Sequence, residues 1–78
     1  MSATAEKLKK CFIDAFGIDS SIFTEEMTPT AVPDWDSLGH VRLVNAMQKE
    51  FGTDFDVEEI MQMEDVPKIL DILKRRGC

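Results

Sequence analysis

Apolar residues recur at helical spacing in four stretches of the 78-residue chain. Those of the first stretch share one helical face: Ala5, Leu8, Phe12, Ala15 and Phe16. Ser2 or Thr4 is placed to cap this helix, and Gly17 is placed to end it. We therefore predict a first helix over residues 4–16.

The second stretch has a wider apolar arc. Its apolar residues are Leu38, Val41, Leu43, Val44, Ala46, Met47 and Phe51. An arc of this width indicates a helix that packs against several neighbours. Asp36 is the best candidate for the N-cap, and Gly52 follows the last apolar residue. These signals predict a helix from Ser37 to Phe51.

A short acidic helix is predicted next. Asp56 and Glu59 have the spacing of a capping box, which predicts a helix from Val57 to about Met61 or Met63. Apolar residues occupy one side of this segment, and acidic residues occupy most of the rest.

The last helix is expected to begin near Val66, with Asp65 as its cap and Pro67 in its first turn. Its apolar residues are expected to face inward, with one of them at the boundary: Ile69, Leu70, Leu73 and, at the boundary, Ile72.

A long loop, residues 17–36, separates the first two helices. Loops of this length are uncommon in compact domains and are often functional. Its apolar residues are spaced to pin it to a core: Ile18, Ile22, Phe23, Met27 and Val32. No segment alternates with the period of a strand. The sequence predicts one all-α domain over residues 1–78, a small four-helix bundle with three long helices, a short third helix and this loop.

Composition excludes several classes of protein. No run approaches the ~20 apolar residues that a membrane span requires. The first ten residues are polar and charged, unlike a secretory signal, so we expect a cytoplasmic protein. Two cysteines, Cys11 and Cys78, are too few for a disulfide scaffold, and with the single His40 they do not form a zinc-binding set.

The net charge of −6 is concentrated in the middle of the chain. Residues 19–65 contain twelve acidic residues against Arg42 and Lys49, which gives −10. An acidic surface repels nucleic acid and attracts basic protein surfaces. We therefore expect protein partners and no nucleic acid.

Motifs of enzymes and metal sites are absent. The chain has no G-x-S-x-G and no glycine-rich nucleotide motif. His40 lies near Ser37, but no residue is placed to orient it as a general base, so we expect a surface or boundary histidine. The acids at Asp34 and Asp36 resemble the start of a calcium loop, but later positions lack the required oxygen ligands. We expect no catalytic residue and no metal ligand.

Ser37 is left as the residue of interest, at a helix start that a long loop displays. A serine at such a position is most often only a helix cap. The unpaired amides and positive dipole of a helix N-terminus also stabilise a phosphate ester, so the site suits a phosphodiester on Ser37. Gly39 costs about 1 kcal/mol of helix propensity relative to Ala. We interpret Gly39 as bare backbone beside Ser37 that a modifying enzyme or a tethered arm can approach.

Residues 35–44, WDSLGHVRLV, resemble a known motif, the phosphopantetheine attachment site of acyl carrier proteins. The order of helices and loop resembles that family along the whole chain. The resemblance implies that Ser37 takes a covalent 4'-phosphopantetheine arm from coenzyme A, and that the thiol of the arm holds an acyl group as a thioester. Asp36 and Leu38 match the flanking motif, which implies recognition by a phosphopantetheinyl transferase.

The resemblance also implies that the protein is not an enzyme and that it has particular partners. These are the phosphopantetheinyl transferase, an acyl-loading ligase or transferase, and downstream acyl-accepting enzymes. Residues 36–51 have a net charge of zero, whereas carriers of ordinary fatty acid synthesis have a strongly acidic second helix. Trp35 and the Gly39-His40 pair are also unusual for those carriers. A specialised carrier with its own loading enzyme is therefore expected, rather than a housekeeping fatty-acid carrier.

Two alternatives stay open. An aminoacyl or peptidyl carrier uses Ser37 in the same way. A non-enzymatic helical adaptor that binds a partner helix uses Ser37 only as a cap. Methionine adapts to irregular volumes, so Met47, Met61 and Met63 either fill the core or admit an acyl chain between the second and third helices. We expect a monomer, because the sequence shows no spare apolar face.

Overall fold

The computed structural model describes residues 2–78, and these residues form helices and loops without a strand. In order along the chain, the elements are α1 (Ala3–Phe16), the 3-10 helix η1 (Pro29–Ala31), α2 (Ser37–Phe51), α3 (Val57–Gln62) and α4 (Val66–Arg75). The prediction of an all-α fold is confirmed. No helix among the described residues is long and apolar enough to cross a membrane.

Capping residues set the helix ends close to the predicted positions. α1 begins one residue earlier than expected, because Ser2 is the cap and its Oγ accepts a hydrogen bond from the Ala5 amide at 3.1 Å. The predicted bounds of α2 are confirmed. α4 begins where Asp65 accepts a hydrogen bond from the Lys68 amide at 2.9 Å. The 3-10 helix η1 was not predicted, since its Pro-Thr-Ala sequence has no helical periodicity.

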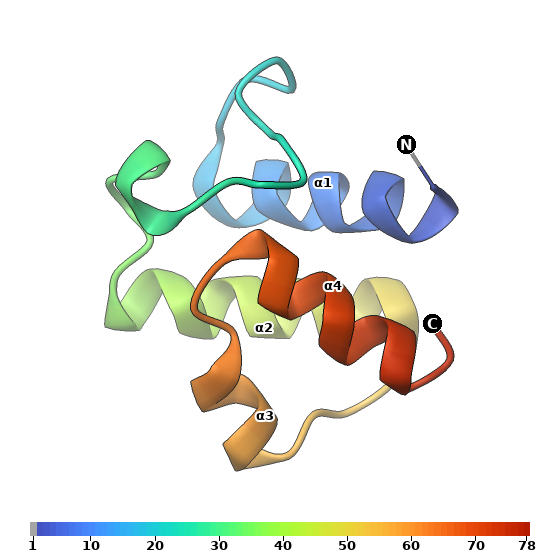
Figure 1. Cartoon of the computed structure of the whole chain (residues 1–78). Helices are drawn as coiled ribbons and strands as arrows, with labels where there is room; N and C mark the ends of the chain where they lie inside the picture. The colour runs from blue at the N-terminus through green and yellow to red at the C-terminus, as the bar shows by residue number, and fades with distance from the viewer. Residues whose placement is uncertain (1) are drawn as a thin grey trace.

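Helices α1 and α2 lie side by side and run in opposite directions, and they form the most extensive helix–helix contact (Figure 1). α4 packs across this pair, and α3 lies beyond α4 at the opposite side from the long loop (Figure 1). The chain ends meet where Thr4 Oγ1 donates a hydrogen bond to the carbonyl of Cys78 at 2.8 Å. The start of α2 is therefore at the end of the molecule remote from both termini (Figure 1).

The long loop supplies a large part of the core. Phe23, Met27 and Val32 are buried as predicted, whereas Ile18 is only partly buried and Ile22 is exposed. Phe12 of α1 packs against two loop aromatics, with ring centroids 5.4 Å from Phe23 and 5.1 Å from Trp35. The Val66 amide also donates to the Met27 carbonyl at 2.9 Å. These contacts hold the loop as an ordered layer, so the segment before Ser37 has a defined position.

Burial differs from the predictions at several apolar positions. Ile72 was placed at the boundary but is fully buried, and Leu70 is only partly buried. In α2 the wide apolar arc does not all pack against neighbours, since Leu38 and Val41 are exposed. In α4 the residues at spacings of three and four around Ile69 and Leu73 point inward, and this register includes Ile72. Both cysteines are free thiols, and burial raises the pKa of Cys11 to about 12.

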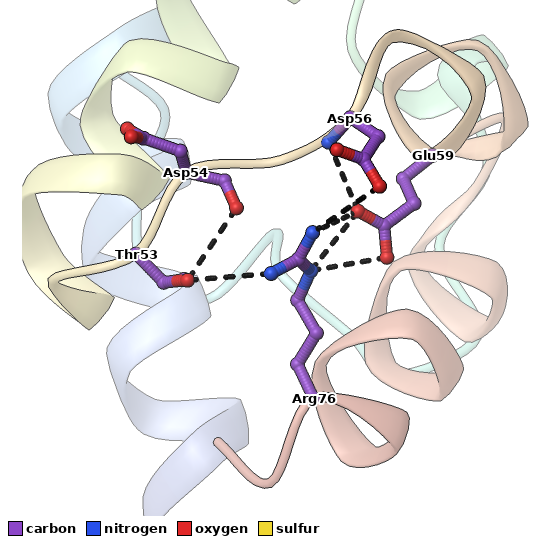
Figure 2. A network of polar contacts seen from close by, with 5 residues as sticks. All are labelled: Thr53, Asp54, Asp56, Glu59 and Arg76. Carbon is purple, nitrogen blue, oxygen red and sulfur yellow. Dashed lines mark hydrogen bonds and ion pairs between the residues drawn. The ribbon is translucent and has the colours of Figure 1, made fainter.

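A polar cluster fixes the end of α4 to the segment before α3 (Figure 2). Arg76 Nε donates to both carboxylate oxygens of Glu59 at 3.0 Å, and its Nη1 donates to Thr53 Oγ1 at 3.4 Å. Its guanidinium also lies 5.2 Å from the centre of the Phe55 ring. Glu59 accepts a further hydrogen bond from the Asp56 amide at 3.0 Å. The cluster therefore anchors the N-terminal turn of α3.

Candidate functional site

Ser37 is the first residue of α2, and its side chain is exposed. The capping role belongs to Asp36, whose Oδ1 accepts a hydrogen bond from the Gly39 amide at 2.8 Å. The Asp36 carbonyl accepts the next helical hydrogen bond, from the His40 amide at 2.7 Å. The sequence prediction of Asp36 as the cap is confirmed. The Ser37 hydroxyl is thus not needed for capping and faces solvent at the positive end of the helix.

Gly39 has a different role from the one that the sequence suggested. A Cβ atom on Gly39 would lie 1.9 Å from the Asp34 carbonyl oxygen and 2.9 Å from Cε1 of Phe16. The backbone of Gly39 is therefore buried under the protein's own loop, and the interpretation that it is bare for a modifying enzyme is wrong. Glycine is required here because the loop crosses the first turn of α2 in direct contact. This contact seats the loop segment that leads into Ser37.

A chain of hydrogen bonds joins the loop, α2 and α3 beside Ser37. Trp35 Nε1 donates to His40 Nδ1 at 2.9 Å, and His40 Nε2 lies 2.8 Å from the carbonyl oxygen of Ile60. A carbonyl oxygen only accepts, so Nε2 carries a proton and Nδ1 accepts from the indole. The two rings lie nearly parallel, at an interplanar angle of 14°. His40 is thus a half-buried boundary residue, as expected, but its bonds were not predicted.

A shallow groove of about 420 Å³ lies next to Ser37. The residues that line it come from the loop, the first turn of α2 and α3: Pro29, Trp35, Asp36, Ser37, His40, Ile60, Met61, Met63 and Glu64. Its walls are mainly apolar, with carboxylates at Asp36 and Glu64. Of the three methionines singled out in the sequence, Met47 and Met63 are buried and Met61 is exposed. Met61 therefore does not fill the core but forms part of this surface.

Two other hollows contain no comparable chemistry. One, of about 460 Å³, lies beside α4 and is lined by residues such as Pro67, Asp71 and Arg75. The other lies between α1 and α2 and is lined by Asp14, Lys49 and neighbouring residues. Neither has a serine or cysteine among its lining residues. A further hollow, of about 330 Å³, is lined by residues that include Ser2 and Cys78, but the Ser2 hydroxyl is engaged as the cap of α1. The groove beside Ser37 is therefore the site of interest. No group of acidic, histidine or cysteine residues within residues 2–78 is arranged to hold a metal ion.

Large apolar side chains are exposed on the two helices, α2 and α3, that contribute residues to this groove. Leu38 and Val41 of α2 are 64% and 55% exposed, and Val57 and Met61 of α3 are 72% and 74% exposed. The sequence showed no spare apolar face, because its periodicity assigned these residues to the interior. Exposed large apolar side chains that gather in one region typically mark a binding surface. Leu38 follows Ser37 directly and Met61 lines the same groove, so a partner at Ser37 can contact both apolar side chains.

The site that emerges has one exposed hydroxyl, no oriented general base and an adjoining apolar surface. Both ring nitrogens of His40 are engaged, so neither is free to remove a proton from Ser37. A comparison of the chain with models of known protein families finds no match.

Proposed function

We propose that this protein is an acyl carrier. Ser37 receives a 4'-phosphopantetheine arm from coenzyme A, and the thiol of that arm carries acyl groups as thioesters to partner enzymes. The observation that carries the proposal is the exposed Ser37 hydroxyl at the start of α2, within Asp36-Ser37-Leu38 and freed from capping by Asp36. The protein does no catalysis in this role. A tether supplies a high effective concentration of cargo to each partner.

The helix start suits the chemistry of the attachment. A phosphodiester on Ser37 adds a negative charge where the dipole of α2 is positive. In the first turn of α2, Asp36 accepts from the Gly39 amide, so the amides before Gly39 remain to face an anion. Phosphopantetheinylation is thus expected to leave the helix intact.

The arrangement of helices also agrees with a carrier bundle. Three longer helices of 14, 15 and 10 residues surround the core, and the third helix has only 6 residues. The long loop packs on this core and presents Ser37 at one end of the molecule (Figure 1). This four-helix bundle with a long first loop resembles the architecture expected of the acyl carrier family.

The surface around Ser37 suits transient protein partners. Leu38 and Val41 offer apolar contacts directly after the serine, and Asp36 and Glu64 offer carboxylates to a basic partner. The expected partners are a phosphopantetheinyl transferase, an acyl-loading ligase or transferase, and downstream acyl-accepting enzymes. Because residues 36–51, which comprise α2 and its cap Asp36, have no net charge, these partners are expected to belong to a specialised pathway rather than to housekeeping fatty acid synthesis.

Two other functions remain as proposals. An aminoacyl or peptidyl carrier uses Ser37 identically and differs only in its cargo. A helical adaptor is favoured by one observation, the exposed apolar residues of α2 and α3, which also suit a partner helix. The adaptor needs no modification of Ser37, so the modification separates the two classes.

The test is to incubate the purified protein with coenzyme A and a phosphopantetheinyl transferase and to measure its intact mass. We expect a gain of one phosphopantetheine, absent in Ser37→Ala and retained in the matched variant Ser20→Ala, which changes another exposed serine. Circular dichroism of both variants checks that the helices are unchanged. If the wild type gains no mass with several transferases, including that of its native host, the adaptor is favoured.

A further inference from the structure

Helix α3 has little packing of its own to hold it in place. It has only 6 residues, and none of them is fully buried. Isolated helices of this length are unstable in water, so contacts with the rest of the protein must fix its position. Ile60 packs against the core, and two polar contacts add to this: Arg76 binds Glu59 in the first turn of α3, and His40 binds the Ile60 carbonyl in its second half.

The hydrogen bonds of His40 involve residues on both sides of Ser37 in the sequence. Trp35 precedes the serine by two residues, and His40 follows it by three, so their hydrogen bond closes a loop around the attachment point. The bond from His40 to Ile60 then brings α3 against this loop. Ile60, Met61 and Ser37 consequently line the same groove. Met61 is 74% exposed there, so its position relative to Ser37 depends on where α3 is held.

We propose that His40 is a positioning residue for the modification of Ser37. Its hydrogen bonds hold α3 beside the start of α2, so that Met61 and the exposed residues of α2 form one surface for the phosphopantetheinyl transferase. This inference rests on the proposed carrier function. His40 does not act as a base, because Nδ1 accepts from Trp35 and Nε2 donates to Ile60.

Two substitutions of His40 separate the effect of its hydrogen bonds from the effect of its side-chain volume. His40→Leu fills similar space but removes both hydrogen bonds. His40→Gln keeps one donor and one acceptor at the end of a side chain of similar reach. We expect kcat/KM for phosphopantetheinylation to fall about tenfold in His40→Leu, mainly through KM, because the loss lies in binding. His40→Gln is expected to recover most of that loss.

A matched control accounts for lost stability. Ile69→Val removes a methylene from a buried residue of α4 that lies outside the groove. It lowers global stability and is expected to leave kcat/KM unchanged. Met61→Ala is expected to raise KM, and its effect should largely disappear when it is combined with His40→Leu, because the two residues act through one surface.

Hydrogen exchange tests the same link without any modification of the protein. The Ile60 amide donates to the Asp56 carbonyl, and the Met63 amide donates to the Ile60 carbonyl, at the two ends of α3. We expect both amides to exchange about tenfold faster in His40→Leu than in the wild type. Core amides of α1 should be unaffected.

The outcomes separate the two proposals. A wild type that accepts no arm overturns the carrier function, and the positioning role falls with it. A wild type that is modified, together with His40→Leu at the same kcat/KM, overturns the positioning role alone. The positioning role is also overturned if Ile69→Val at matched stability lowers kcat/KM as much as His40→Leu does, or if α3 exchange is unchanged.

Discussion

The arrangement around Ser37 depends on three neighbouring residues with separate roles. Asp36 caps α2, Gly39 admits the loop, and His40 ties the loop and α2 to α3. Because capping does not depend on Ser37, its hydroxyl can be changed or esterified without loss of the helix end. We therefore expect substitutions of these neighbouring residues to have different effects on stability.

Asp36→Ala and Ser37→Ala should differ in stability. Asp36→Ala removes the acceptor for the Gly39 amide, and loss of an N-cap costs about 1 kcal/mol of unfolding free energy. Ser37→Ala removes an exposed hydroxyl and should stay within about 0.5 kcal/mol of wild type. Urea unfolding followed by circular dichroism measures both values. An equal loss in the two variants would show that Ser37 shares the capping role.

Gly39→Ala tests the close approach of the loop. Helix propensity alone predicts a stabilisation of about 1 kcal/mol, because alanine replaces glycine inside a helix. The Asp34 carbonyl, 1.9 Å from the new Cβ, predicts the opposite sign, since the loop must move off α2. We expect a net loss of about 1–3 kcal/mol in urea unfolding. Asn45→Ala, at an exposed position of the same helix, is the control and should be nearly neutral. A stabilised Gly39→Ala contradicts this view of the loop.

At the scale of elements, the sequence predicted helix ends better than helix faces. Caps and glycines are local signals, and Asp36 and Gly52 define the ends of α2, Ser37 and Phe51, around its apolar repeat. The faces depend on what packs against each helix. Leu38 and Val41 continue the apolar repeat of α2, but no element covers them. Periodicity alone cannot distinguish an apolar residue that is buried from one that stays exposed.

The bonds of His40 and the role of Gly39 could not be predicted for a related reason. Both depend on segments that the tertiary fold brings together, namely Ile60 for His40 and Asp34 for Gly39. A partial signal was present, since a buried indole N–H needs an acceptor and Trp35 lies five residues before the only histidine. The candidate serine itself was predictable, because a helix start is encoded locally.

The cluster around Arg76 gives an element-scale prediction about pH. The hydrogen bond from Arg76, followed by that from the Asp56 amide, lowers the pKa of Glu59 below its ordinary value of 4.5. A lowered pKa in the folded state adds stability above the ordinary value, and this stability is lost as pH falls through the folded value. Arg76→Gln should therefore be less stable than wild type at pH 7. The difference should shrink below about pH 4.5.

Thermal unfolding from pH 3 to pH 7 measures this difference. Arg75→Gln is the matched control, because Arg75 forms an ion pair with Asp71 at 3.2 Å, and its charge is the smallest of the influences that lower the pKa of Glu59. It should change stability little at any pH in this range. A constant difference between Arg76→Gln and wild type across the range would contradict the role of the Glu59 carboxylate.

At the scale of the whole molecule, the core and the proposed partner surface are separate. Buried residues from α1, α2, α4 and the loop form the core, while exposed apolar residues gather on α2 and α3. Variation on the exposed surface can thus change partners without changing the fold. This separation suits a protein that several enzymes must recognise in turn.

Leu38→Ala and Leu43→Ala test this separation on one helix. Leu38 is 64% exposed, so Leu38→Ala should leave stability within about 0.5 kcal/mol but raise KM for phosphopantetheinylation several-fold. Leu43 is fully buried, so Leu43→Ala should lose about 2–5 kcal/mol of unfolding free energy. Chemical denaturation and transferase kinetics give the two readouts. A large stability loss in Leu38→Ala would place that residue in the core instead.

The central claim is that Ser37 carries a phosphopantetheine arm. The most direct measurement is fragment mass spectrometry of the protein after reaction with coenzyme A and a phosphopantetheinyl transferase. We predict one arm with a free thiol, located on Ser37 and on no other residue. An arm on a different residue, or an unmodified Ser37 after reaction with the transferase of the native host, would contradict it.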